Sequence, residues 1–307
     1  MPAGRLTIGM SEPQFDRTFE AVAGRVEQVS PLVRRVLCGN ASPFTFTGTS
    51  SFIVGRGRVA IIDPGPDDPA HLAALLAAVN GESVSHILVT HSHADHSPLA
   101  ARLQAATGAP ILAQGSAAEA AAGQARLDAG IDRQFAPDRR LGHGERIEGA
   151  AWSLEAIFTP GHMSNHLCFA LAEERTLFSG DHVMSWATSV IAPPEGNMAD
   201  YLASLRLLLG RGEDIYLPAH GPARRDPLPY VRDLIAHRQK REAAILAAIA
   251  EGEATLNQIV ARVYAGLDQR LLGAAALSAR AHIDHLLAQG RIRETEGRFE
   301  PRPGTLR

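Results

Sequence analysis

Short apolar runs alternate with amphipathic stretches through residue 222, which predicts strands interleaved with helices. Residues 44–55 alternate and turn at glycines, and residues 59–66 predict a buried strand that ends in a Gly/Pro loop. Further strands, with the loops at their ends, are expected within residues 85–90, 110–114, 152–162, 166–173, 175–183 and 215–222. Helices are expected at 68–79, 98–108 and 198–210, and an alanine-rich helix followed by a loop at 117–140. This order predicts an α/β fold with sheet inside and helices outside.

The pattern changes after Pro229. Three helical stretches follow at 230–252, 256–264 and 277–290, and residues 290–302 predict a hairpin that turns at Gly297. Three helices and a hairpin resemble a winged-helix module. We therefore divide the chain into a larger domain of residues 1–228 and a smaller C-terminal domain of residues 229–307.

Composition narrows the function classes. The chain has 307 residues, 45% of them hydrophobic, and a net charge of -3, so no overall basic field favours nucleic acid. Its first residues lack the apolar run of a signal peptide, and no stretch has the length of a membrane span. The two cysteines, Cys38 and Cys168, lie far apart, which is not typical of a disulfide framework. We expect a cytoplasmic protein without membrane contact.

A compact group of metal-capable side chains follows the strand expected at 85–90. Residues 91–96 read HSHADH and place His91, His93, Asp95 and His96 in one loop. Three further loops at strand ends, TPGH, SGD and PAHG, add His162, Asp181 and His220. Imidazole and carboxylate ligands from several loops suit Zn²⁺, with Mn²⁺ and Fe²⁺ as alternatives.

These motifs resemble the five motifs of the metallo-β-lactamase superfamily, over residues 26 to 225. The resemblance implies a four-layer αββα sandwich with two divalent metal ions at one sheet edge, followed here by the winged-helix-like domain. It implies that His91, His93 and His162 hold the first metal and that Asp95, His96 and His220 hold the second. Asp181 would bridge the two, and Asp63 in IIDPG would orient the metal loop from behind it.

Two details narrow the resemblance. The bridging position is occupied by Asp181, and this aspartate resembles glyoxalase II, tRNase Z and related hydrolases. Because a cysteine is missing there, we expect turnover of β-lactams to be absent or slow. The C-terminal helices resemble the lactamase-beta-2 group, which carries a winged-helix-like domain and includes ribonucleases of single strands.

The implied chemistry is hydrolysis by a metal-bridging hydroxide, with Asp95 as the catalytic residue that shuttles the proton. We expect a small-molecule ester, thioester, lactone or similar carbonyl substrate. Two alternatives stay open: a single-strand endoribonuclease with RNA as its partner, and a nucleic-acid-binding or interaction protein acting through the winged-helix-like domain. A mononuclear iron dioxygenase is a minor alternative. The sequence leaves the oligomeric state open, a homodimer included.

Some histidines and one basic run have two interpretations each. His166 and His182 are proton donors to a leaving group or fill space behind the ligands. Residues 237–241, HRQKR, form a phosphate patch or a solvated helix face. His282 and His285 are expected on a helix surface.

Overall fold

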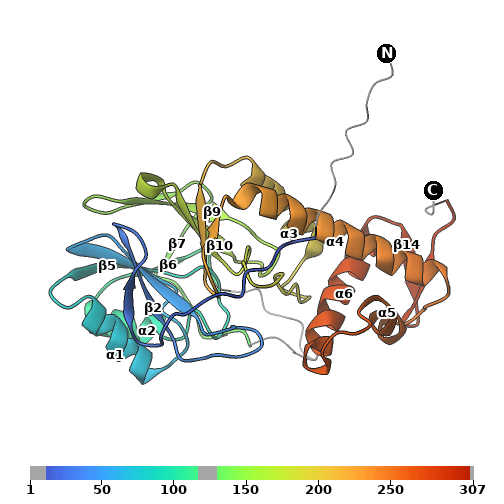
Figure 1. The fold of residues 1–307 in the computed structure, drawn as a ribbon, viewed down its shortest axis with the longest axis horizontal. Helices are drawn as coiled ribbons and strands as arrows, with labels where there is room; N and C mark the ends of the chain where they lie inside the picture. Colours follow the sequence, from blue (N-terminus) through green and yellow to red (C-terminus); the bar gives the residue numbers. More distant parts are fainter. Residues whose placement is uncertain (1–11, 117–129, 305–307) are drawn as a thin grey trace, which may run out of the picture.

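The computed structural model describes residues 12–116 and 130–304 and contains two large β-sheets packed face to face (Figure 1). The first sheet has the order β1 (Val26–Gln28), β2 (Val33–Leu37), β3 (Ser50–Val54), β4 (Arg58–Ile62), β5 (Ser83–Leu88), β6 (Ile111–Ala113) and β7 (Arg139–Arg140). The second has the order β13 (Arg224–Arg225), β12 (Ile215–Pro218), β11 (Thr176–Gly180), β10 (Leu167–Leu171), β9 (Ser153–Phe158) and β8 (Arg146–Glu148).

The inner strands are buried on both faces because their side chains alternate between two cores, whereas β1 and β7 at the ends of the first sheet are exposed. In β3, Phe52 faces the core between the sheets, whereas Ile53 faces the helices outside. In the second sheet Phe169 and Phe178 face the same central core. Apolar side chains at successive positions therefore cover both faces of each sheet.

Helices cover the two outer faces. Helices α1 (Pro69–Ala78) and α2 (Ala100–Thr107) pack on the first sheet through Leu75 and Leu103. Helices α3 (Met198–Leu209) and α4 (Pro227–Ala250) pack on the second. The result is the expected αββα sandwich of four layers. A short 3₁₀ helix, η1 (Ala172–Glu174), connects β10 to β11.

The C-terminal part consists of α5 (Leu256–Val263), η2 (Gln269–Leu271), α6 (Leu272–Ala288) and the hairpin of β14 (Ile292–Thr295) and β15 (Arg298–Pro301). Its core is built from Ile259, Ile283 and Phe299. The hairpin turns at Gly297, whose positive φ of 73° the turn requires. These elements have the winged-helix arrangement expected from the sequence.

Helix α4 belongs to both cores. Tyr230 and Leu234 in its first half pack in the core beneath the second sheet, and Ile245 and Ile249 in its second half pack in the C-terminal core. Figure 1 shows the helix running from the sandwich to the C-terminal elements. The division into residues 1–228 and 229–307 stays a prediction, and α4 already begins at Pro227.

Several expectations need correction. The alternating stretch expected to begin at residue 44 forms a strand only from Ser50, because residues 40–49 fold back on themselves through hydrogen bonds of Asn40 and Ser42. His282 is not on a helix surface; it is fully buried between α4 and α6. The first part of the alanine-rich helix expected at 117–140 lies outside the described residues.

Two other expectations hold for the part of the chain that the structure describes. Cys38 and Cys168 are free and buried. No helix within residues 12–116 and 130–304 has the length and apolar character to cross a membrane.

Candidate metal centre

The residues predicted from the four loops meet at one edge of the sandwich. His91 follows β5, His162 follows β9, Asp181 follows β11 and His220 follows β12. Strands β4 and β5 are parallel, as are β11 and β12, so the carboxyl ends of each pair reach the same edge. Topology therefore gathers side chains that are up to 129 residues apart in the sequence.

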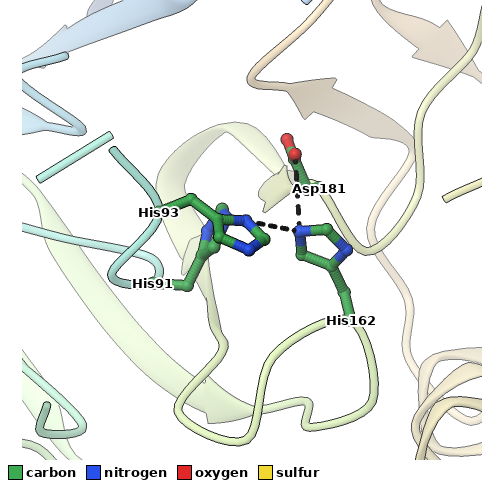
Figure 2. A group of neighbouring side chains, drawn as sticks. All are labelled: His91, His93, His162 and Asp181. Atoms are coloured by element: carbon green, nitrogen blue, oxygen red, sulfur yellow. Dashed lines mark hydrogen bonds and ion pairs between the residues drawn. The ribbon is translucent and has the colours of Figure 1, made fainter. Parts of the chain in front are cut away.

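The first group of ligand atoms contains three imidazole nitrogens and one carboxylate (Figure 2). His93 Nδ1 lies 2.9 Å from His91 Nε2 and 3.0 Å from His162 Nε2. Asp181 Oδ2 lies 3.6 Å from His162 Nε2. Together these atoms are all within 4.8 Å of one another, a spacing at which one cation could contact all four.

The second group lies on the other side of Asp181. Asp95 Oδ2 is 3.4 Å from His96 Nε2 and 3.2 Å from His220 Nε2. Asp181 Oδ1 is 3.3 Å from His220 Nε2 and 3.6 Å from His96 Nε2. The two oxygens of Asp181 thus face the two groups, as a bridging ligand requires.

Partners behind the rings fix which nitrogen carries the proton. His162 Nδ1 donates to the carbonyl of Val190 at 2.6 Å, and His220 Nδ1 donates to the carbonyl of Gly48 at 3.2 Å. A carbonyl oxygen only accepts, so the proton is on Nδ1 in both rings. Nε2 of both rings therefore faces the site, as a metal ligand requires.

Asp63 organises the loop from behind the ligands. Its Oδ2 accepts from His96 Nδ1 at 3.0 Å, which leaves His96 Nε2 for the centre. Thr90 donates to both carboxylate oxygens of Asp63, from its backbone N–H and from its hydroxyl, each at 2.7 Å. Asp63 itself has a positive φ of 49°, an unfavourable backbone conformation that this network holds in place.

Charge and burial also suit a cation. Burial and the neighbouring His93 lower the pKa of His162 to about 4, so its ring is neutral at pH 7. Burial disfavours the charged form of Asp181, yet His220 and His96 hold the pKa of that carboxyl well below its usual range. Among the described residues, His96 Nε2 and Asp181 Oδ1 are buried without a hydrogen-bond partner. Such polar atoms are costly unless a ligand satisfies them, so the residues present fit a metal.

His166 and His182 lie behind the ligands and line neither cavity that borders the site. His166 Nδ1 is 2.9 Å from Thr159 Oγ1, and its Nε2 accepts from the backbone N–H of Asp181 at 3.3 Å. It therefore holds the backbone of Asp181. His182 is fully buried, and its ring lies 4.8 Å from that of Tyr201. Neither ring is placed to reach a leaving group.

A small cavity of about 40 Å³ lies over the ligand atoms. Asp95, His93, His162 and Asp181 line one side, and Phe44, Met184, Val190 and Ala192 line the other. These apolar residues belong to none of the sequence motifs. The only signal for them was their position in loops that flank the motifs, which does not distinguish them from other loop residues.

The fold and the site together define a hydrolase of the metallo-β-lactamase fold. Residues 44–220 match the family model described as metallo-beta-lactamase superfamily, and residues 255–299 match the model described as beta-lactamase associated winged helix domain. The first match covers more than half of the chain, so this protein belongs to the metallo-β-lactamase superfamily and carries its associated winged-helix domain.

Curated relatives of similar length agree with this assignment. The chain is 32% identical over 265 residues to an atrochrysone carboxyl ACP thioesterase of Aspergillus terreus, covering 80% of this chain and 76% of that protein. It is also 32% identical over 234 residues to the lactamase-like protein adaB of Aspergillus niger, covering 75% and 68%.

Solved structures support the fold. A beta-lactamase domain protein from Burkholderia ambifaria aligns with a TM-score of 0.77 and 24% identity, over 91% of this chain and 94% of that chain. A metallo-beta-lactamase family protein from Thermus thermophilus aligns with a TM-score of 0.74 and 23% identity, over 90% and 100%. At this identity the likeness extends to the fold alone.

Proposed function

We propose that this protein is a metal-dependent thioester hydrolase. The observation that carries the proposal is the pair of His/Asp groups, one on each side of Asp181. The relative from Aspergillus terreus, named as an ACP thioesterase, favours a thioester among the small carbonyl substrates that such a site can cleave. Oxygen esters and lactones present the same carbonyl chemistry and belong to the same class.

The proposed cofactor is two divalent metal ions, most simply Zn²⁺, with Mn²⁺ and Fe²⁺ as alternatives for these ligands. His91, His93 and His162 would hold one ion, Asp95, His96 and His220 the other, and Asp181 would contact both. Bound ions would supply Lewis-acid activation of water and of the carbonyl. Asp95 lines the cavity and would hold the proton released by the attacking water until it reaches the thiolate leaving group.

RNA is a weaker candidate substrate, because much of the basic run at 237–241 contacts other parts of the protein. Arg238 is buried, with 3% of its surface exposed, and donates to the carbonyl of Ser189. Lys240 and His237 both pair with Glu12, at 2.9 and 2.8 Å. Most of this charge is engaged within the protein. A cytoplasmic location completes the proposal.

The test is a substrate panel with protein loaded with Zn²⁺ or Mn²⁺. It contains N-acetylcysteamine thioesters, the matched oxygen esters, a lactone, a penicillin and single-stranded RNA. We expect thioesters to have the highest kcat/KM and expect Asp95→Asn to lower it by roughly 10²-fold or more. Asp67→Asn, on an exposed carboxylate paired with Arg102, is the matched control. Fast RNA cleavage that depends on Asp95, without thioester hydrolysis, contradicts the proposal.

A further inference from the structure

A second cavity, of about 330 Å³, lies between loops that flank the metal centre and the C-terminal domain. It shares Phe44, Met184 and Val190 with the small cavity over the ligand atoms, so the two cavities lie side by side; the larger one is here called the interdomain cleft. Its volume is at the lower end of the range for small-molecule sites. The catalytic domain provides one wall and residues from α4 to α6 provide the other.

The cleft has an apolar and aromatic lining. Trp186 forms part of one wall and stacks on Phe46, with ring centroids 5.0 Å apart and planes 15° from parallel, which fixes the indole as a flat surface. Phe15 and Leu267 line the cleft although 39% and 37% of their surfaces are exposed. Large apolar side chains left open to water on one cavity are typical of a ligand site.

Arg238 fixes the wall nearest the metal centre. It donates to the carbonyl of Ser189, next to Val190, whose own carbonyl orients His162. The loop that lines the cleft therefore also positions a proposed metal ligand. A group bound in the cleft would lie against the same loop that sets the direction of His162.

Arg241 lies one helical turn further along α4, toward the C-terminal domain. Its guanidinium stacks 4.3 Å over the ring of Tyr264, and its Nη1 donates to the carbonyl of Val263 at 2.6 Å. In the part of the chain that the structure describes, no carboxylate pairs with Arg241 or with Arg17, which also lines the cleft. Two positive charges thus border an apolar space without a counterion among the described residues.

We infer that the interdomain cleft binds the acyl group of the substrate, and that this group is bulky, apolar and flat, with an anionic substituent that Arg241 contacts. The inference rests on the proposed thioesterase function and names its substrate class. The reacting carbonyl would lie at the metal centre, the apolar body against Trp186, and the anion between Arg241 and Arg17. An arginine fork holds a carboxylate with two parallel hydrogen bonds, so this contact gives selectivity as well as affinity.

The cleft suits such an acyl group better than RNA. Its volume of about 330 Å³ is that of a compact molecule, not of a strand. RNA binding also needs several solvent-exposed cations along a track, whereas His237 and Lys240 on the same helix are already paired with Glu12.

The first test varies the acyl group at a constant thiol. Acetyl and 2-naphthoyl thioesters of N-acetylcysteamine are compared in the metal-loaded protein and in Ala274→Trp, which places a large side chain in the cleft from α6. We expect the ratio of kcat/KM for naphthoyl over acetyl to fall at least about tenfold in the variant, equal to about 1.4 kcal/mol. Arg232→Gln, on an exposed residue of α4 outside the cleft lining, should leave the ratio unchanged.

The second test addresses the anion. A 6-carboxy-2-naphthoyl thioester is compared with the 2-naphthoyl thioester. We expect the wild-type protein to prefer the carboxylated substrate by about tenfold or more in kcat/KM, and we expect Arg241→Gln to abolish this preference. Arg241→Lys, which keeps the charge but not the fork, should retain part of it. If a substitution at Arg241 only disturbed the structure, kcat/KM for both thioesters would fall together and their ratio would stay the same.

Binding without turnover separates this inference from the proposed function. Naphthalene-2,6-dicarboxylate is titrated calorimetrically into metal-free protein, where we expect Arg241→Gln to weaken binding about tenfold and Arg232→Gln to leave it unchanged. If that binding holds but no thioester is cleaved, the thioesterase proposal fails and the cleft assignment stands. The cleft assignment is overturned if Arg241→Gln and Ala274→Trp change neither ratio of kcat/KM. It is also overturned if the size of their effect depends on the thiol of the substrate and not on its acyl group. A third contrary result would be that they weaken the binding of an RNA oligonucleotide and not of the dicarboxylate.

Discussion

Asp63 Oδ2 lies 3.0 Å from His96 Nδ1, and this hydrogen bond determines which nitrogen of His96 faces the metal centre. In Asp63→Asn, an amide that can present its NH₂ group no longer selects this tautomer. We expect affinity for the second metal to fall by about 10–100-fold, with a smaller change for the first. Competition with a chromophoric chelator measures both constants. Equal weakening of both metals would show that Asp63 acts on the loop as a whole, and Asp67→Asn serves as the control.

Metal content tests the pair of ligand groups. We expect close to two metals per chain in protein loaded with Zn²⁺ or Mn²⁺, and close to one in His220→Ala, because His220 faces only the second group and Asp181. Elemental analysis after gel filtration gives the stoichiometry. A wild-type protein that stays at one metal under excess would contradict the dinuclear site and favour the mononuclear iron alternative.

His71 gives a prediction about pH and stability. Its Nε2 lies 2.8 Å from Ser51 Oγ, whose hydroxyl donates to the carbonyl of Asp63, and its buried Nδ1 has no partner in the described residues. Burial lowers the pKa of His71 to about 4, below the 6.5 of an unfolded histidine. The unfolded chain therefore takes up the proton first as pH falls. The stability present above pH 6.5 should decline toward pH 4 by up to about 3 kcal/mol.

Denaturant unfolding of metal-free protein at several pH values measures this loss. His71→Gln should show a shallower decline than the wild type, because a side chain that does not titrate cannot take up the proton. His143→Gln, at an exposed turn, is the matched control. Parallel curves for wild type and His71→Gln would contradict the assignment.

The two cysteines should be inert in the folded protein. Burial raises the pKa of Cys168 to about 12 and that of Cys38 to about 11, so neither forms the reactive thiolate at neutral pH. We expect no reaction with a disulfide reagent at pH 8 and titration of two thiols after unfolding in guanidinium. Rapid modification of the native protein would show that one of them becomes accessible.

The grouping of the candidate ligands could be predicted because each follows an apolar strand and belongs to a short motif. Parallel strands deliver their carboxyl ends to one edge, so the order of strands and motifs was enough to bring His91, His162, Asp181 and His220 together. The layers followed from the same alternation of strand and helix. Asp63 was also placed correctly, from a motif without any ligand spacing of its own.

Long-range packing explains what the sequence did not indicate. Arg238 sits in a charged run typical of an exposed helix face, yet it is buried because the loop at Ser189 covers that face of α4. His282 is buried for a similar reason, since α4 packs over it and places Glu242 Oε2 3.4 Å from its Nδ1. Phe44 lies in a stretch that alternates like a strand, and only the fold shows that it reaches the metal centre. Local patterns carry no signal for such contacts.

Helix α4 contributes Leu234 to one core and Ile249 to the other, and this limits where the two domains can be separated or exchanged. The winged-helix region cannot be exchanged as a cassette cut at the start of this helix, because the sandwich would lose the apolar side chains that α4 packs beneath its second sheet. A chimera that respects both cores must keep α4 whole and join after Ala250, in the short segment before Leu256. An incoming C-terminal domain would then be compatible only where its own helices pack against the apolar side chains of Ile245 and Ile249 on α4.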